Sequence, residues 1–331
     1  MHMADALVSV PVAAGVGTIS ILTAAYCLKK VRKEDEPKKI ALMGVLGAFV
    51  FAAQMINFTI PGTGSSGHLC GGMLLSAILG PYAGFLTMIG VLLVQALLFA
   101  DGGLLALGCN IWNMAFYSCF IGCLIVWLGF VKNGLSRTKI ILASVLGSVL
   151  TLQLGAFSVT IETLLSNITA LPFGLFVLAM QPIHLAIGLV EGFITAAVLL
   201  YIYSVRPGIL YGVEKSSADD LSLGKVVASL SIATAVIAGV LSLVASELPD
   251  GLEWSMERVA GTSELTSSGS VHESAAFLQK ITAILPDYAI PGSDSALGTI
   301  ISGLLGAILV AGLCLLAANL FKMFKGLKAH E

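Results

Sequence analysis

The sequence contains few charged residues. Only 11% of its 331 residues are Asp, Glu, Lys or Arg, whereas soluble domains carry about 25%. Hydrophobic residues make up 57% of the chain, and the mean hydropathy is +0.97. One buried core cannot account for this much apolar surface, which requires lipid as its solvent. The composition therefore excludes a water-soluble protein and predicts an integral membrane protein.

Motifs for common enzymatic chemistry are also missing. The phosphate-binding patterns GxxxxGKS and GxxxxGKT do not occur, so we expect no ATP hydrolysis by this chain itself. The HExxH motif and the known nucleophile motifs are absent as well. The six cysteines lie within or at the edge of apolar runs, where we expect packed thiols and no disulfides. We expect no nucleic acid among the partners.

Apolar runs, most of them long enough to cross a bilayer, recur along the chain. They lie at about 6–28, 40–60, 69–80, 82–100, 105–130, 139–166, 173–204, 225–246 and 297–321. Of the 17 Lys and Arg residues, all but Arg258 and Lys280 fall in four segments, which follow the first, fifth, seventh and ninth runs. The positive-inside rule places these four segments in the cytoplasm.

This orientation decides how the stretch Leu69–Ala100 is divided. An even number of crossings must separate the two cytoplasmic loops that flank it, so it contains two spans, broken at Gly80-Pro81. The first of the pair has only about 12 residues, and it is either tilted inside the bundle or partly re-entrant. The sequence thus predicts an all-α, polytopic transmembrane helical bundle of about nine spans, with the N-terminus outside and the C-terminus cytoplasmic.

The spans group into seven plus two. Residues 1–204 form the larger membrane module, 205–224 a polar cytoplasmic linker, and 225–331 a two-span module with an extracytoplasmic insert at 247–296. The first apolar run, Ala6–Leu28, lacks a basic region before it and an Ala-x-Ala cleavage site after it. We therefore expect it to remain in the mature, multi-pass protein of the cell membrane.

Two of the five histidines fall on the predicted outer side. His2 is the second residue, and His68 ends the loop PGTGSSGH. A histidine in second position lets the α-amino group, its own amide nitrogen and its imidazole close two fused chelate rings around one metal. Such a site suits Ni(II) and Cu(II), and Co(II) can follow. Met1, His2 and His68 are therefore the candidate metal site, and the alternative is that His2 is an incidental terminal residue.

Polar residues near the outer ends of the fourth and fifth runs form a second group. Asp101, Asn110 and Asn113 lie on the side where they could orient His68 without touching the metal. Hydrogen bonding between helices is the competing interpretation for each of them.

The remaining histidines are assigned to other roles. His184 and Glu191 lie seven residues apart on one face of the seventh run, where a buried structural pair is favoured over a metal site. His272, in the insert, and His330, in the tail, are expected to be solvated.

Several segments together resemble one known family. They are MHMADAL, GTGSSGHLCGGMLLSAILGPYAG, QALLFADGGLLALGCNIWNMA and HLAIGLVEGFIT. The family is the substrate-specificity (M) component of energy-coupling factor transporters for nickel and cobalt. The segment LPDGLEWSMERV resembles the small N component of the same transporters, here fused to M.

The resemblance implies a function and partners. Ni(II) or Co(II) would be captured at the outer face, and transport would require a transmembrane coupling (T) component and cytoplasmic ATPase subunits. The family's ligands, which are the amino terminus, a histidine at position 2 and a loop histidine, match Met1, His2 and His68. Small residues on the first helix, Ala13, Ala14 and Gly17, could pack closely against the coupling subunit or within this chain.

Two other functions stay open from the sequence alone. A self-sufficient ion-coupled carrier would often show inverted repeats and a midplane site, and neither is found. An intramembrane enzyme would use His184 and Glu191 for proton chemistry. The choice between nickel and cobalt is also open, although a planar set of nitrogen donors favours nickel.

Overall fold

The computed structural model describes residues 1–34, 36–213, 223–293 and 295–328. The described residues are helical apart from connecting segments and one short hairpin of β1 (Phe58–Ile60) and β2 (Ser65–Gly67), so the all-α prediction is confirmed. In chain order the helices are η1 (Asp5–Leu7), α1 (Val10–Glu34), α2 (Pro37–Gln54), α3 (Gly72–Leu79), α4 (Pro81–Leu98), α5 (Leu107–Asn110), η2 (Ile111–Trp127), α6 (Leu128–Val131), α7 (Arg137–Ser166), α8 (Phe173–Val205), η3 (Pro207–Ile209), α9 (Leu223–Gly239), η4 (Leu241–Val244), α10 (Gly251–Ala260), α11 (Ser270–Thr282), η5 (Pro286–Tyr288) and α12 (Ala296–Lys328).

Six of the described helices are long and apolar enough to cross a membrane. They are α1, α4, the continuous helix formed by α5, η2 and α6, and α7, α8 and α12. Two more helices are of similar length, because α2 has 18 residues, as many as α4, and α9 has 17. The six membrane-length helices carry large apolar side chains on their outer faces. Examples are Leu178 and Phe193 of α8, which are 69% and 61% exposed. The prediction of a multi-pass membrane protein is confirmed, and its orientation in the membrane stays a prediction.

The short run at 69–80 is not one helical span. Its helix, α3, has eight residues, all buried, and at 1.5 Å per residue it is about 12 Å long, against about 30 Å of hydrocarbon. Non-helical chain leads from β2 into the bundle, where α3 begins. Such backbone is tolerated at membrane depth only when protein surrounds it. Of the two alternatives for this run, the structure therefore supports the partly re-entrant one.

The break between α3 and α4 lies where the sequence predicts it. Gly80 adopts φ 80°, a left-handed conformation that glycine accepts readily. Pro81 is the first residue of α4, a position where its missing N–H costs no hydrogen bond. A Cβ at Gly84 would lie 3.1 Å from the Ser76 backbone, so α4 folds back closely along α3.

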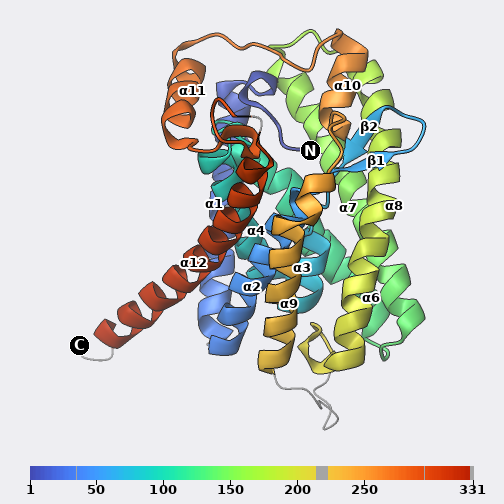
Figure 1. Ribbon diagram of the computed structural model, residues 1–331, viewed down its shortest axis with the longest axis vertical. Coiled ribbons are helices and arrows are strands. Elements are labelled where there is room, and N and C mark those ends of the chain that lie inside the picture. Colours follow the sequence, from blue (N-terminus) through green and yellow to red (C-terminus); the bar gives the residue numbers. More distant parts are fainter. Residues whose placement is uncertain (35, 214–222, 294, 329–331) are drawn as a thin grey trace.

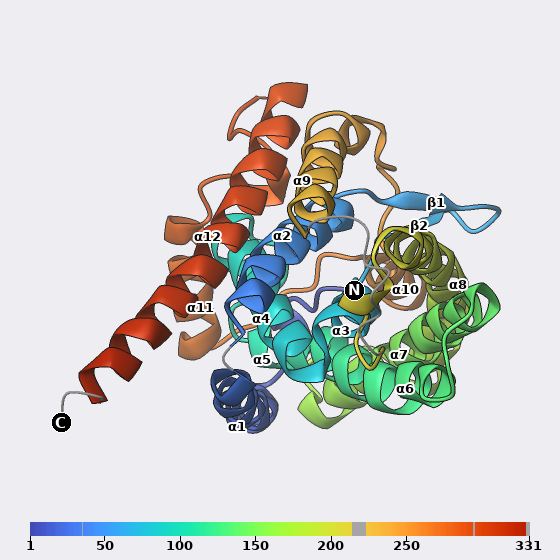
Figure 2. The same cartoon turned by 90° about the horizontal axis from the view of Figure 1, so that it is seen from below.

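Helix α1 lies at the edge of the bundle (Figure 2). Ala13 is buried, and a Cβ at Gly108 of α5 would collide with the Gly17 backbone. Ala14 is exposed. Two of the three small residues on this helix thus pack within the chain, and the third is exposed.

The two long helices of the C-terminal module, α9 and α12, pack against one side of α2 (Figure 2). Figure 2 shows α2 between α9 and α12 on one side and α3 and α4 on the other. The packing is close, because a Cβ at Gly44 of α2 would lie 3.3 Å from the Ala311 carbonyl oxygen of α12. The linker at 205–224 falls partly outside the described residues, so its boundaries stay a prediction.

The insert of the C-terminal module lies at the same end of the molecule as the N-terminus (Figure 1). There the β2 edge binds the chain just before α10, because Ser66 N donates to the Pro249 carbonyl at 2.8 Å. The expectation that His272 is solvated is wrong. His272 of α11 is buried, and its Nε2 lies 3.0 Å from the Val8 carbonyl. His330 lies outside the described residues.

Candidate metal-binding site

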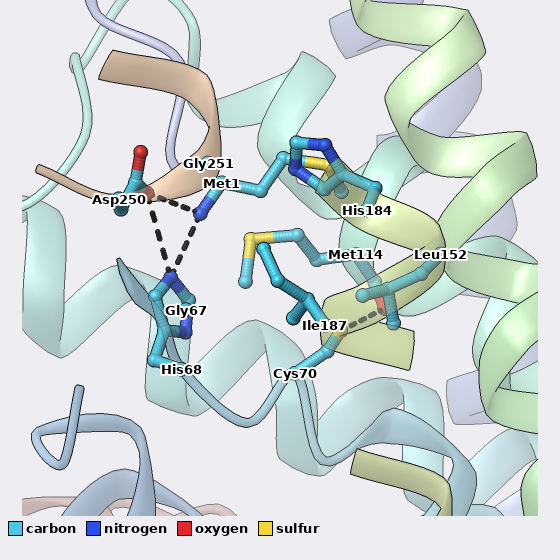
Figure 3. A pocket seen from close by; sticks show the side chains of 10 residues that line it. All are labelled: Met1, Gly67, His68, Cys70, Met114, Leu152, His184, Ile187, Asp250 and Gly251. Atoms are coloured by element: carbon cyan, nitrogen blue, oxygen red, sulfur yellow. Dashed lines mark hydrogen bonds and ion pairs between the residues drawn. The ribbon is translucent and has the colours of Figure 1, made fainter. Parts of the chain in front are cut away.

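The N-terminal amine lies buried in a small pocket together with His68. The Met1 nitrogen is 2.7 Å from His68 Nε2 and 2.7 Å from Asp250 Oδ2 (Figure 3). The rings of His2 and His68 are stacked, with centroids 5.1 Å apart and planes inclined by 18°. The structure therefore brings Met1, His2 and His68 together, although 67 residues separate the first from the last.

Residue 3 anchors the terminal segment. Met3 N donates to Asn110 Oδ1 at 2.7 Å, and Asn110 Nδ2 donates to the Met3 carbonyl at 3.1 Å. Asn113 lies against the Met3 sulfur and donates to Glu162 Oε2 at 2.7 Å. These contacts fix the backbone from which the first two residues reach into the pocket.

Each nitrogen of the His2 ring faces a side-chain oxygen. Nδ1 lies 3.1 Å from Asp101 Oδ1, and Nε2 lies 3.2 Å from Gln95 Oε1. Burial lowers the pKa of His2 to about 4, against the opposing attraction of Asp101. The imidazole is therefore neutral near pH 7. It then carries one N–H and donates to only one of the two oxygens, and the neutral ring is the form that coordinates metals.

The structure corrects the expected role of the polar group near His68. Asp101 contacts His2, while Asn110 and Asn113 contact Met3. The physical reason is that the N-terminal segment lies against these residues and uses their hydrogen-bonding capacity. They orient the terminal residues, and their hydrogen bonds go to those residues instead of to His68.

Asp250 is a site residue that the sequence analysis missed. Its Oδ1 accepts hydrogen bonds from Leu252 N and Glu253 N, while the Glu253 carboxylate accepts from Asp250 N, which completes a capping box at the start of α10. Its Oδ2 is left for the Met1 ammonium. Burial alone would raise the pKa of Asp250, but the ammonium and His68 prevail and hold it well below its usual value. The spacing Asp-Gly-x-Glu could have revealed the cap, but not the contact with an amine far away in sequence.

The wall of the pocket includes Gly251 and His184 (Figure 3). A Cβ at Gly251 would lie 2.8 Å from Ile187 Cδ1 and 3.1 Å from His184 Cε1, so a larger residue here would have to displace these two side chains. His184 Nδ1 contacts the Met180 carbonyl at 2.8 Å, and its Nε2 has no partner among the described residues.

The expected pairing of His184 with Glu191 is not observed. The Glu191 carboxylate accepts from Cys70 N at 2.8 Å and Gly71 N at 3.1 Å, where α3 begins. These buried amides have no partner within the helix, so they attract the carboxylate away from the histidine. Each residue of the predicted pair therefore has a separate role.

The geometry suits one metal ion bound by nitrogen. Two nitrogens bound at right angles to one metal at about 2.0 Å lie about 2.8 Å apart, close to the 2.7 Å between the amine and His68 Nε2. Within the described ranges, no three His, Cys, Asp or Glu side chains are grouped to hold a metal. A metal site here would therefore need main-chain nitrogens among its donors.

Comparison with known families addresses the two halves of the chain. Residues 2–209 match CbiM, described as the cobalt uptake substrate-specific transmembrane region, and residues 224–323 match the PDGLE domain. The chain belongs to the CbiM family. In the rest of the article, the CbiM region and the PDGLE domain denote these two matched ranges.

Relatives share both parts in the same order. The chain is 34% identical to an Archaeoglobus fulgidus protein whose name describes a fused nickel transport protein, NikMN, over 95% of this chain and 96% of that protein. It is 30% identical to the fused nickel transport protein NikMN of Rhodobacter capsulatus over 96% and 97%. These are names of transport proteins, as the sequence predicts, and not of enzymes.

A solved structure, titled as a truncated transition metal transporter, resembles the chain. The TM-score is 0.55 at 31% identity, and the match covers 62% of this chain and 99% of that one.

Four of the five residues that spell PDGLE line the pocket or support it, and the fifth, Leu252, is buried. The Pro249 carbonyl binds β2, Asp250 caps α10 and holds the amine, and Gly251 leaves room for His184. Glu253 closes the capping box.

Proposed function

We propose that this chain is the substrate-capturing membrane subunit of an ATP-driven nickel or cobalt uptake transporter. It binds Ni(II) or Co(II) at its outer face through the free amine of Met1, the backbone and ring nitrogens of His2, and His68. The observation that carries the proposal is the buried amine 2.7 Å from His68 Nε2. The names of the fused relatives, which are nickel transport proteins, support the same cargo.

Capture at this site exchanges protons for a cation. The Met1 ammonium loses one proton, the His2 amide loses its proton, and the His2 imidazole coordinates as a neutral ring. A divalent cation with one deprotonated amide carries the same net charge as the ammonium that it replaces. Asp250 therefore faces an unchanged net charge, and the coordinated amine keeps N–H bonds that can still donate to Oδ2.

Capture also requires the His2 ring to change partner. The six-membered chelate ring that shares the His2 amide closes through Nδ1, and this atom contacts Asp101 Oδ1 at 3.1 Å in the structure. The metal must replace that contact. Because four nitrogen donors in one plane suit Ni(II) best, we expect nickel to bind more tightly than cobalt.

Energy for transport comes from separate subunits. The chain lacks a phosphate-binding motif, so we propose cytoplasmic ATPase subunits acting through a transmembrane coupling (T) component. Helix α1 is the proposed docking surface, because it lies at the edge of the bundle (Figure 2) and is the least buried of the six membrane-length helices in the described part of the chain.

The test is metal binding by the full chain with its own N-terminus. Calorimetric titration should give one Ni(II) per chain, and Gly-Ser placed before Met1 should abolish binding by converting the amine to an amide. The same dipeptide placed after Glu331 is the matched control and should have no effect. His2→Ala should abolish both binding and ATP-dependent uptake in membranes that contain the partner subunits. Unchanged nickel binding in the extended chain would contradict the proposal.

A further inference from the structure

The turn at residues 95–102, which comprises the last residues of α4 and the chain that follows them, holds the ring of His2. Gln95 and Asp101, at its two ends, contact Nε2 and Nδ1 of the imidazole. The backbone closes on itself, because Asp101 N donates to the Gln95 carbonyl at 3.1 Å. Ala100 adopts φ 55° within the turn, a conformation that is unfavourable for alanine. The turn therefore depends on outside contacts to keep its shape.

Those contacts come from residues 279–288 of the PDGLE domain. Four hydrogen bonds run from this segment to carbonyl groups of the turn: Gln279 Nε2 to Ala96 (2.9 Å) and Gly102 (2.7 Å), Leu285 N to Leu98 (3.2 Å) and Asp287 N to Phe99 (2.9 Å). They are distributed along the turn, so the PDGLE domain supports its whole length.

Tyr288 adds the contact nearest to the metal site. Its hydroxyl donates to Asp101 Oδ2 at 2.5 Å, and its ring stacks on Phe99 with centroids 4.8 Å apart. Burial, together with the charge of Asp101, holds the pKa of Tyr288 well above its usual value, so the phenol remains a donor. Asp101 thus contacts His2 through one oxygen and Tyr288 through the other.

Backbone strain is concentrated at the same contact. Four described residues other than glycine have positive φ, namely Ala100, Asn167, Asp287 and Tyr288. Three of them lie in the turn or in the segment that binds it. Strained conformations persist only where the surroundings determine them, and they tend to cluster at functional sites.

We propose that Tyr288, acting through Asp101, is a positioning residue for His2, by which the PDGLE domain sets how tightly the terminal chelate holds its metal. This inference rests on the proposed function. Asp101 competes with the metal for Nδ1 of His2. The Tyr288 hydroxyl donates a hydrogen bond to the Asp101 carboxylate and fixes its position. Asp101 then aligns the His2 ring, while its contact with Nδ1 stays weak enough for the metal to replace it. Without that hydroxyl, the carboxylate relies more on the imidazole, and the metal has to displace a stronger contact.

The experiment compares variants of the full chain with a native N-terminus. Tyr288→Phe keeps the ring that stacks on Phe99 and removes only the hydroxyl. We expect Ni(II) affinity in calorimetry to fall about tenfold, as for loss of one hydrogen bond to a charged group. The visible absorption band of the bound nickel should shift as well. Tyr201→Phe, which removes a hydroxyl that donates to Ser229 at a distant, exposed place, is the matched control and should change neither.

A double-mutant cycle separates positioning from general support of the fold. In an Asp101→Asn background, Tyr288→Phe should change the affinity less than about twofold, because its route to His2 has already been altered. An equal loss in both backgrounds would overturn the inference, since Tyr288 would then act independently of Asp101. Unchanged affinity and absorption in Tyr288→Phe would also overturn it, while loss of binding in His2→Ala would leave the proposed function standing. If His2→Ala also binds nickel normally, both proposals fail.

Discussion

The two helices of the insert, α10 and α11, reach the N-terminal pocket in different ways. Helix α10 directs its first turn at the pocket, and the Asp250 carboxylate that caps it also pairs with the Met1 amine. Helix α11 contributes from its side, where His272 binds the Val8 carbonyl and Gln279 binds the turn after α4. Its opposite side exposes Phe277, which is 67% accessible.

The difference teaches which interactions must be direct. A charge stabilises an ammonium only at close range, so the carboxylate of α10 has to lie beside the amine. A helix can fix the conformation of a turn by hydrogen bonds, and the turn can then position a side chain. Helix α11 can therefore influence His2 without contacting it. Variants of the two helices should therefore differ in size of effect, and three substitutions test this order.

The largest effect is expected at Asp250. Asp250→Ala leaves the buried ammonium without its carboxylate and removes the cap of α10, which should destabilise the metal-free chain by about 3–5 kcal/mol. Thermal unfolding in detergent would show this as a lower melting temperature. Asp250→Asn keeps a capping oxygen, so the difference between the two variants separates the charge from the cap. Equal melting temperatures for Asp250→Ala and the natural chain would show that the amine is not held there.

An intermediate effect is expected at Gln279. Gln279→Met keeps a side chain of similar length and removes two hydrogen bonds to the turn, at a cost of about 1–3 kcal/mol. Hydrogen exchange of the amides at residues 95–102 should accelerate. The neighbouring exposed substitution Lys280→Met is the control. Exchange that stays as slow as in the natural chain would argue against support of the turn by α11.

The smallest effect is expected on the outer side of α11. Phe277→Ser alters an exposed side chain, so stability in detergent should change by less than about 0.5 kcal/mol. Nickel binding should be unchanged. A large fall in either quantity would mean that this side of α11 is covered, which would remove the contrast between the two helices.

The sequence predicts the features that depend on composition and on the distribution of charge along the chain. The multi-pass architecture followed from apolar length, and the break at Gly80-Pro81 followed from charge placement and the preferences of two residues. The proximity of His2 and His68 followed from placing both on one side of the membrane. These inferences rest on apolar length, charge distribution and local residue preferences, and none of them needs an exact tertiary contact.

Features that depend on exact tertiary contacts were missed. His272 lies in a polar, acidic insert, and nothing in that composition reveals that α11 turns its polar side inward. Glu191 has helical spacing from His184, but its carboxylate binds the backbone amides of Cys70 and Gly71. These amides lack helical partners because α3 begins inside the bundle. Asp250 shows the same limit, because periodicity cannot indicate which distant group occupies a free carboxylate oxygen.

The covalent link between the CbiM region and the PDGLE domain has a consequence for how the pocket is assembled. Covalent linkage turns the meeting of Asp250 with Met1 into an intramolecular event, with an effective concentration that dilution in the lipid does not lower. Because Met1 and Asp250 belong to one polypeptide, both are present whenever that polypeptide is made. Under the proposed function, metal loading would depend on the copy number of a single gene product and not on the ratio in which two separate subunits are expressed.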